Sequence, residues 1–217
     1  MKTLLFLLVS QSTCLIAILA ISGCVVPGMG PRGKNLGYNG SFEIVESELP
    51  VNWTISRYPV KEGTVEVFVD TTNAVSGERS LRIVVHEYSS TNRWKPFLFQ
   101  VRDAEVGETY AVSLWLKNQG CKVLLEIGYE GKYHMFGGQS EEEKRDYAAH
   151  PRISEVLGEA EMGDDEWRQF RYQYTVPETD GTIRLELTIL QKGTLWIDDV
   201  QIELVADGEP AEDVTED

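Results

Sequence analysis

Eight short segments of alternating apolar and polar residues, separated by polar turns, constrain the fold of this chain most strongly. A strand points successive side chains to opposite faces, so this alternation is typical of strands with one buried face. The segments span residues 64–71, 80–87, 97–102, 109–117, 122–129, 167–176, 181–190 and 194–205. Short strands at regular spacing predict an all-β sandwich or barrel of antiparallel strands.

Residues 130–166 break this rhythm, because the segment is long, polar and charged. We expect it to be one long, partly helical insertion, with Pro151 beginning its second helix. An irregular segment of this length in a compact domain is usually functional or mobile. The tryptophans Trp53, Trp167 and Trp196 are assigned to the core.

The final strand segment, Thr194–Val205, places a carboxylate among apolar residues. Strict alternation puts one set of residues on the face expected to be buried: Trp196, Asp198, Val200, Ile202 and Leu204. A buried carboxylate is costly unless it is paired, protonated or bound to a metal. Ligation by oxygen atoms alone suits calcium. The alternative is a carboxylate at the sandwich edge that backbone donors satisfy.

The N-terminal residues read as a targeting segment. Lys2 is followed by an apolar run to about Ile21 and then by Ile21-Ser22-Gly23-Cys24. This pattern is similar to the lipobox of bacterial lipoproteins, so we expect residues 1–23 to be a signal peptide and Cys24 to carry lipid. The alternative is an uncleaved transmembrane anchor. Either way, the domain is expected in the cell envelope, anchored to the membrane and facing the periplasm or the cell exterior.

The flanks and the charge define the rest of the organisation. Residues 24–34 are rich in Pro and Gly and are expected to be a flexible tether. Residues 206–217 form an acidic tail expected to be disordered, which leaves residues 35–205 as one domain. The formal charge of -15 argues against a nucleic-acid partner. Cys121 is the single cysteine outside the signal and the lipobox, so we expect no internal disulfide.

Seven motifs then follow one another in a recognisable order: NGSFE, Trp53, SGERSLRI, NRWKPFLFQ, GETYAVSLWLKN, WRQFRYQYTV and GTLWIDDVQIE. In this order they resemble the carbohydrate-binding modules of the cellulose- and xylan-binding kind, families four, nine and twenty-two. The resemblance spans residues 35–204 apart from the insertion. It implies a jelly-roll sandwich that binds a polysaccharide or oligosaccharide, of β-glucan or xylan type, on a concave sheet face.

The same resemblance implies a structural calcium ion near the N-terminus of the domain. The positions that match the family's ligands are Glu43, Asp198, Ser41, Ser76 and Arg79. Glu43 and Asp198 would contribute side chains, and the other three would contribute backbone oxygens. Side-chain ligation by Asp198 agrees with the cost of burying its carboxylate.

Sugar recognition needs flat aromatic faces and planar polar groups. Trp115 alternates out of register with the apolar set of its strand, so we expect it to face outward, beside Glu126, Gln100 and Arg171. The alternative is that the insertion covers Trp115 or that it lies in a second core layer. Two further candidates were Trp94, at a cleft edge or in the core, and Tyr129, at the start of the insertion.

An enzyme remains the rival hypothesis, since a glycosidase needs two carboxylates across a cleft and Glu126 could pair with Glu186. The three histidines show no metal-ligand spacing, and no G-x-S-x-G motif is present. A non-catalytic binding module is therefore favoured. The other alternative is a structural or adhesive lipoprotein that contacts other cell-surface proteins.

Overall fold

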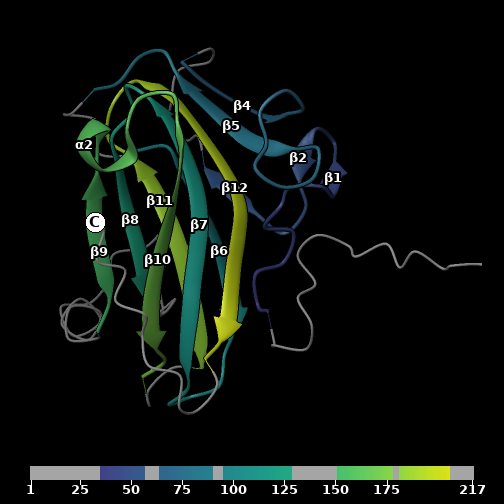
Figure 1. The fold of residues 1–217 in the computed structure, drawn as a ribbon, viewed down its shortest axis with the longest axis vertical. Helices are drawn as coiled ribbons and strands as arrows, with labels where there is room; N and C mark the ends of the chain where they lie inside the picture. Colours follow the sequence, from purple (N-terminus) through teal and green to yellow (C-terminus); the bar gives the residue numbers. More distant parts are fainter. Residues whose placement is uncertain (1–34, 57–63, 90–94, 129–150, 178–180, 206–217) are drawn as a thin grey trace, which may run out of the picture.

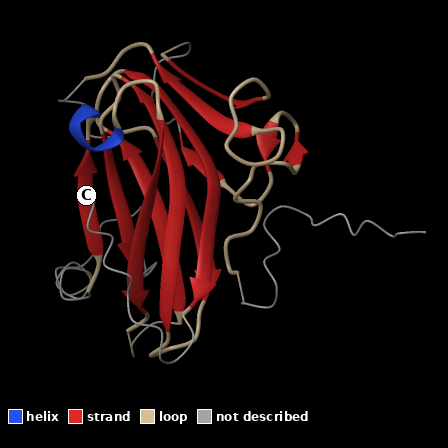
Figure 2. Cartoon of the chain, viewed as in Figure 1, coloured by secondary structure: helices blue, strands red, loops and turns tan. Residues whose placement is uncertain are grey.

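The computed structural model describes residues 35–56, 64–89, 95–128, 151–177 and 181–205. Two five-stranded antiparallel sheets pack face to face, as Figures 1 and 2 show. The predicted β-sandwich with a jelly-roll arrangement is therefore confirmed.

We call the two layers the β7 sheet and the β11 sheet. The β7 sheet has the order β10-β7-β12-β5-β4, from Trp167–Thr175, Thr109–Gln119, Gly193–Leu204, Ser80–Val85 and Val65–Asp70. The β11 sheet has the order β3-β6-β11-β8-β9, from Thr54–Ser56, Phe97–Asp103, Thr182–Ile189, Val123–Gly128 and Ile153–Leu157. A small hairpin joins β1 (Val45–Glu46) to β2 (Leu49–Pro50).

All eight predicted segments form strands, with ends that differ from the prediction by a few residues. The described part of the insertion differs more. Ile153–Leu157 forms β9, which pairs with β8 at the edge of the β11 sheet, so the prediction of a helix beginning at Pro151 is wrong. Ile153 and Val156 favour a strand, which the paired edge of β8 supports. The helix α2 covers only Glu159–Met162, and residues 130–150 lie outside the described residues.

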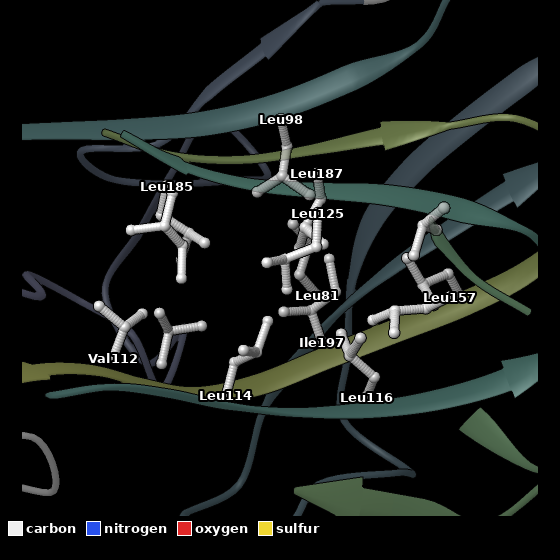
Figure 3. Packing of buried hydrophobic residues seen from close by; sticks show 14 of the residues in the cluster. Leu81, Leu98, Val112, Leu114, Leu116, Leu125, Leu157, Leu185, Leu187 and Ile197 are labelled. Atoms are coloured by element: carbon white, nitrogen blue, oxygen red, sulfur yellow. The ribbon is translucent and has the colours of Figure 1, made fainter. Parts of the chain in front are cut away.

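The core fills the space between the sheets, as Figure 3 shows. The facing sets include Val112, Leu114 and Leu116 from the β7 sheet and Leu125 and Leu185 from the β11 sheet, all with no exposed surface. Each such side chain contributes about 1.5–3 kcal/mol by leaving water. Cys121 is buried beside this core, and burial raises the pKa of its thiol to about 12.

In β6, and in β12 before its bulge, the inner and outer faces are the reverse of those predicted. A bulge in β12 lies between Asp198 and Gln201, where Asp199 has φ 47°. Leu195 and Ile197 face the core before the bulge, and Val200 and Ile202 face it afterwards. A bulge inserts one extra residue and so reverses the faces. The prediction that Trp196 and Asp198 share the core face is therefore wrong, and both lie on the outer side of the β7 sheet.

The second reversal is in β6. Leu98 and Gln100 pair with Leu187 and Leu185, which belong to the core, so they point inward. Phe97 and Phe99 alternate with these residues and consequently point outward. The prediction that Gln100 faces outward is therefore reversed. Trp167 of β10 also lies on an outer face, opposite Lys117, rather than in the core. Trp53 is in the core as predicted, packed on Phe42 at a ring-centroid distance of 5.3 Å.

Candidate functional site

Two carboxylates from opposite ends of the domain sequence meet at the turn between β4 and β5. Asp198 Oδ2 accepts hydrogen bonds from the backbone N–H groups of Val75, at 2.7 Å, and Ser76, at 2.9 Å. Its Oδ1 accepts from Asp199 N–H at 2.7 Å. Asp198 is 0% exposed, and burial raises the pKa of its carboxyl to about 6 although these hydrogen bonds act to lower it. The turn therefore satisfies the buried carboxylate through backbone donors.

Glu43 contacts the other half of the same turn. Its Oε1 accepts from the backbone N–H groups of Glu78, at 2.7 Å, and Arg79, at 2.9 Å. Its Oε2 lies 3.3 Å from Arg79 Nη1. Gly77 has φ 63°, and a Cβ atom there would lie 2.3 Å from Glu43 Oε1. Only glycine suits this position, because both the backbone conformation and the close carboxylate exclude a side chain.

The turn contains oxygen atoms of the kind that a hard cation prefers as ligands. Ser76 Oγ is buried and has no hydrogen-bond partner in the described part of the chain. Glu43 Oε2 and Asp198 Oδ1 each accept one hydrogen bond, so each keeps a lone pair. Ser41, also buried, precedes Glu43 by two residues. No group of three or more His, Cys, Asp or Glu side chains lies together in the described residues, so calcium here would depend on hydroxyl, carbonyl and water oxygens.

The residues predicted to form one sugar platform lie in three different places. Trp115 and Arg171 are on the outer face of the β7 sheet. Glu126 is on the outer face of the β11 sheet. Gln100 is buried, with 2% exposed. The structure therefore does not bring these four side chains together.

Gln100 is buried and forms hydrogen bonds with backbone groups. Its amide accepts from Tyr38 N–H at 3.1 Å and donates to the carbonyl oxygens of Tyr38, at 2.8 Å, and Asn52, at 3.1 Å. It ties the N-terminal segment to β6, so its prediction as a sugar contact is wrong. Trp94, Tyr129 and Cys24 lie outside the described residues.

The outer face of the β11 sheet carries a polar row across four strands. Phe99, Glu186, Glu126 and Ser154 lie directly opposite one another on β6, β11, β8 and β9. Burial and the neighbouring Glu186 raise the pKa of the Glu126 carboxyl, while Arg152, Arg184 and a hydrogen bond from Ser154 act to lower it. The two acids, Glu126 and Glu186, are thus offset by the two arginines.

Arg184 forms the planar centre of this face. Its guanidinium lies 3.8 Å from the centre of the Phe99 ring. Glu186 Oε2 accepts from Arg184 Nε at 2.9 Å and from Nη2 at 2.5 Å, and Glu186 Oε1 accepts from Thr188 at 3.0 Å. The Phe99 ring also stacks on Phe97, with centroids 5.8 Å apart. These contacts hold Arg184 and Glu186 in one arrangement over the Phe99 ring, which is itself 8% exposed. The planar guanidinium and carboxylate are groups that can hydrogen-bond sugar hydroxyls.

The outer face of the β7 sheet carries a row of alternating rings and cations. Trp167, Lys117, Trp196, Arg82 and Phe68 lie opposite one another on β10, β7, β12, β5 and β4. The Arg82 guanidinium is 4.9 Å from the Trp196 ring and 5.1 Å from the Phe68 ring, and Lys117 Nζ is 5.4 Å from the Trp196 ring. Cations at these distances are attracted to ring faces. We call this set the ring–cation row.

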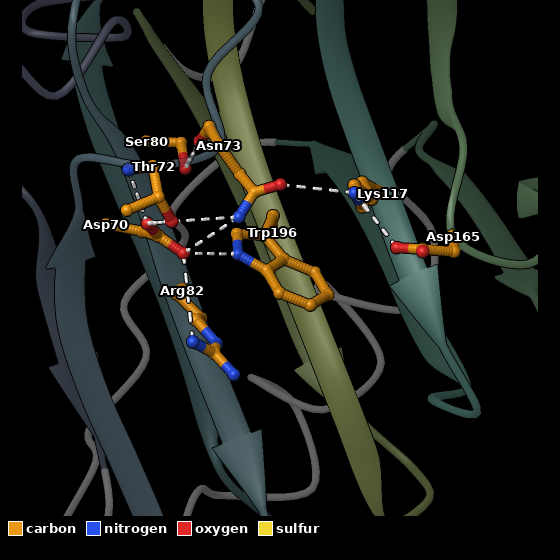
Figure 4. Close-up of polar contacts among 8 residues, drawn as sticks. All are labelled: Asp70, Thr72, Asn73, Ser80, Arg82, Lys117, Asp165 and Trp196. Carbon is orange, nitrogen blue, oxygen red and sulfur yellow. Dashed lines mark hydrogen bonds and ion pairs between the residues drawn. The ribbon is translucent and has the colours of Figure 1, made fainter.

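Carboxylates fix the row from both sides, as Figure 4 shows. Asp70 Oδ2 accepts from Trp196 Nε1 at 2.8 Å and lies 3.8 Å from Arg82. Burial acts to raise the pKa of Asp70, but hydrogen bonds from Thr72, Trp196 and Asn73 outweigh it and lower the pKa to about 2. Lys117 is held by Asp165 at 2.9 Å. Trp196 is therefore 4% exposed although it is on an outer face.

Glu126 and Trp115 lie on outer faces as the sequence predicts, but on different sheets, and their contact with sugar stays a prediction. The contact between Phe99 and Arg184 was not predicted. The expected outward position of Gln100 implies that its neighbour Phe99 faces the core, and the structure reverses both positions. The alternation of Arg184, Glu186 and Thr188 along β11 was the available signal for a polar outer face. The pairing of that face with Phe99 depends on β6 and β11 being neighbours, which the sequence does not encode locally.

Comparisons with known proteins concern the fold alone. No protein-family model and no curated protein matches this sequence. Among solved structures, a protein described under "CBM4 structure and function" matches with a TM-score of 0.51 and 17% identity over 77% of this chain and 99% of that one. The CBM22-1 xylan-binding domain of Paenibacillus barcinonensis Xyn10C matches with a TM-score of 0.50 and 17% identity over 82% and 98%.

Two further solved structures are similar to this chain. TmCBM61 in complex with beta-1,4-galactotriose matches with a TM-score of 0.50 and 18% identity over 80% of this chain and 100% of that one. The enzymatically active domain of bacteriophage CBA120 tailspike protein 4 matches with a TM-score of 0.57 and 18% identity, and this chain spans 21% of its length. The chain has the jelly-roll fold found in carbohydrate-binding modules.

Among the described residues, no helix has the length and apolar character needed to cross a membrane.

Proposed function

We propose that this protein is a non-catalytic glycan-binding module, lipid-anchored in the cell envelope, that binds a neutral polysaccharide or oligosaccharide of β-glucan or xylan type. The observation that carries the proposal is the surface around Arg184, with its guanidinium stacked on Phe99 and held by Glu186. The likeness of the fold to solved carbohydrate-binding modules supports it.

The charges on this face indicate the kind of sugar. Glu126 and Glu186 are offset by Arg184 and Arg152, so the face has no net charge among these four groups. Sugar hydroxyls can donate to the carboxylates and accept from the guanidinium. A hydrogen bond from a sugar hydroxyl to Glu126 would also stabilise the ionised carboxylate of Glu126, because the neighbouring Glu186 disfavours its ionisation. An uncharged sugar chain therefore suits this face better than an acidic one.

A structural calcium ion is part of the proposal. Glu43 and Asp198 would hold it through their side chains, with oxygen atoms of Ser41, Ser76 and Arg79 completing the set. The ion would join the first described segment to the last strand, and it would take no part in contacting sugar. Besides these oxygen atoms, the Ser76 hydroxyl is buried and has no hydrogen-bond partner in the described part of the chain, so it is a further candidate ligand.

Replacing Glu186 with glutamine, or Arg184 with methionine, should weaken glycan binding by about 1–3 kcal/mol, the scale of a central interface residue. Glutamine keeps the shape but loses the charge that fixes Arg184. Affinity electrophoresis and calorimetry of the full-length protein against xylan, mixed-linkage β-glucan, cellulose and β-1,4-galactan would measure the loss. Glu203→Gln, an equivalent change on the other sheet, is the control and should bind like the wild type.

The same samples test the other candidate functions. Glu126 and Glu186 face each other on adjacent strands, which also allows a pair of catalytic carboxylates. Release of reducing ends by the wild type, lost in Glu126→Gln and Glu186→Gln, would establish an enzyme and reject the binding module. Failure to bind every glycan tested would instead favour a structural or adhesive protein.

The anchor gives a separate prediction. Wild-type protein should partition into the detergent phase with Cys24 as its lipidated N-terminus, because Ile21-Ser22-Gly23-Cys24 has the lipobox pattern. Cys24→Ser should abolish lipid attachment and cleavage at this position. Detergent-phase partitioning and mass spectrometry of the N-terminus would measure both. Unmodified Cys24 in the wild type, with residues 1–23 retained, would support a transmembrane anchor.

A further inference from the structure

The outer face of the β7 sheet has an aromatic surface that the proposed sugar site does not use. Trp115 and Trp167 are on neighbouring strands, and both are partly exposed and outside the hydrophobic core. Trp115 of β7 lies opposite Gln169 of β10. Trp167 is the next outward residue of β10 before Gln169, and it lies opposite Lys117 of β7. The two indole rings are therefore diagonal neighbours on one face, within reach of a shared ligand.

The described part of the insertion leaves both tryptophans partly exposed, although α2 packs beside β7. Its strand β9 pairs with β8 in the other sheet. The next residues form α2, which is four residues long and precedes Trp167. This observation argues against the alternative that residues 151–166 bury Trp115.

Polar groups beside the two rings are already positioned. Gln169 Oε1 accepts from Arg171 Nε at 3.1 Å, which orients the amide and the guanidinium together. Lys117, between Trp167 and Trp196, is held by Asp165 at 2.9 Å and Asn73 at 3.2 Å. Lys117 and Trp196 are therefore held in place beside Trp167.

The charge of this surface favours a neutral ligand. Lys117 and Arg82 are each paired with a carboxylate, Asp165 and Asp70, and the cation that belongs to the proposed face is Arg171, which contacts the neutral Gln169 amide. The chain as a whole carries a formal charge of -15, which repels polyanions. Indole faces suit the apolar sides of uncharged sugar rings, and the Gln169 and Arg171 groups suit hydroxyls.

We propose that Trp115 and Trp167, with Gln169 and Arg171, form a second glycan-binding face for an uncharged polysaccharide. The two sheets pack with the core between them, so this face and the Arg184 face point in opposite directions (Figure 1). One domain then holds two separate polysaccharide chains. It cross-links them, and binding to a surface that displays many chains gains from avidity. The cross-linking consequence rests on the proposed function of the Arg184 face, but the second face does not.

The test uses the full-length protein with soluble xylan and β-1,4-galactan in parallel. Wild-type protein should cross-link whichever of the two glycans it binds more tightly, and this should raise the light scattering of the solution. Calorimetry should resolve two classes of binding site. Trp115→Ala and Trp167→Ala should each weaken one class about tenfold and abolish cross-linking. Glu186→Gln should weaken the other class and leave this one intact. Gln173→Ala, on the same face but farther along β10, is the matched control.

Each outcome separates the two sites. If only Glu186→Gln changes binding, and both tryptophan variants cross-link normally, the second face is rejected while the proposed function stands. If only the tryptophan variants change binding, the Arg184 face is rejected and the second face stands alone. If no glycan binds the wild type, both fail. Gln169→Ala and Arg171→Ala, which remove smaller groups, repeat the test if a tryptophan variant melts below the assay temperature.

Discussion

Replacing Trp196 with alanine should lower the free energy of unfolding by about 3–5 kcal/mol, the range for truncating a buried aromatic residue. The expected loss is large because Trp196 is the centre of the ring–cation row and is 4% exposed. Its removal takes the ring away from both Arg82 and Lys117 and leaves Asp70 Oδ2 without the indole donor. Urea denaturation of the wild type and the variant would measure the difference.

Two control variants separate the contributions. Trp196→Phe keeps a ring for both cations but removes the hydrogen bond to Asp70, so it should lose about 1 kcal/mol beyond the smaller apolar area. Trp115→Ala removes a partly exposed tryptophan from the same face and should be clearly less destabilising. If Trp196→Ala and Trp115→Ala lose equal stability, the row does not stabilise the sheet in the way its contacts indicate.

The strands could be predicted because their signal is local. Alternation along 109–117 or 181–190 reports the burial of one face, and both segments form strands as predicted. The hairpin β1–β2 and the strand β3 were missed because two or three residues contain no measurable period. The strand β9 was missed because its pattern carries charged neighbours, and its pairing with β8 determines its structure.

The faces of two strands could not be predicted because a shift of one residue reverses every side chain. In β12 the extra residue near Asp199 causes the reversal, and nothing in the letters IDDV specifies a bulge. In β6 the inward position of Gln100 depends on Tyr38 and Asn52, which are far away in the sequence. A polar residue in an apolar strand was therefore assigned to the surface although it satisfies buried backbone groups.

The candidate sites depend even more on topology. Glu126 was recognisable as an outward acid, but its opposition to Glu186 requires β8 and β11 to be neighbours. The ring–cation row takes one residue from each of five strands, in an order unrelated to the sequence. By contrast, Glu43 and Asp198 both contact the turn between β4 and β5, where the resemblance implied that they lie near each other.

Replacing Asp198 with alanine should lower the free energy of unfolding by about 2–4 kcal/mol. The substitution leaves the part-buried N–H groups of Val75, Ser76 and Asp199 without their acceptor. A fully buried unsatisfied group costs about 1–3 kcal/mol, and water can reach these donors in part. Relief from burying a carboxylate offsets part of this, because burial raises the pKa of Asp198 to about 6. Asp198→Asn keeps one acceptor oxygen and should recover part of the loss. Thermal and urea unfolding in chelator would measure these differences without any contribution from a metal.

Calcium should add a second, separable effect at the same residue. A ligand that binds only the native state stabilises it by about 2.7 kcal/mol at a hundredfold excess over its dissociation constant. We therefore expect chelation to lower the melting temperature of the wild type by several degrees, and added calcium, more than magnesium, to restore it, because the turn offers irregular oxygen ligands. Both Asp198→Ala and Asp198→Asn should lose this response, since neither keeps the charge that a cation needs. Gln201→Ala, beyond the bulge, should keep the response to calcium.

Identical melting curves in chelator and in calcium, for wild-type protein first shown to be metal-free, would reject the calcium site. The loss measured for Asp198→Ala in chelator would still stand, because it depends on the turn's own N–H donors.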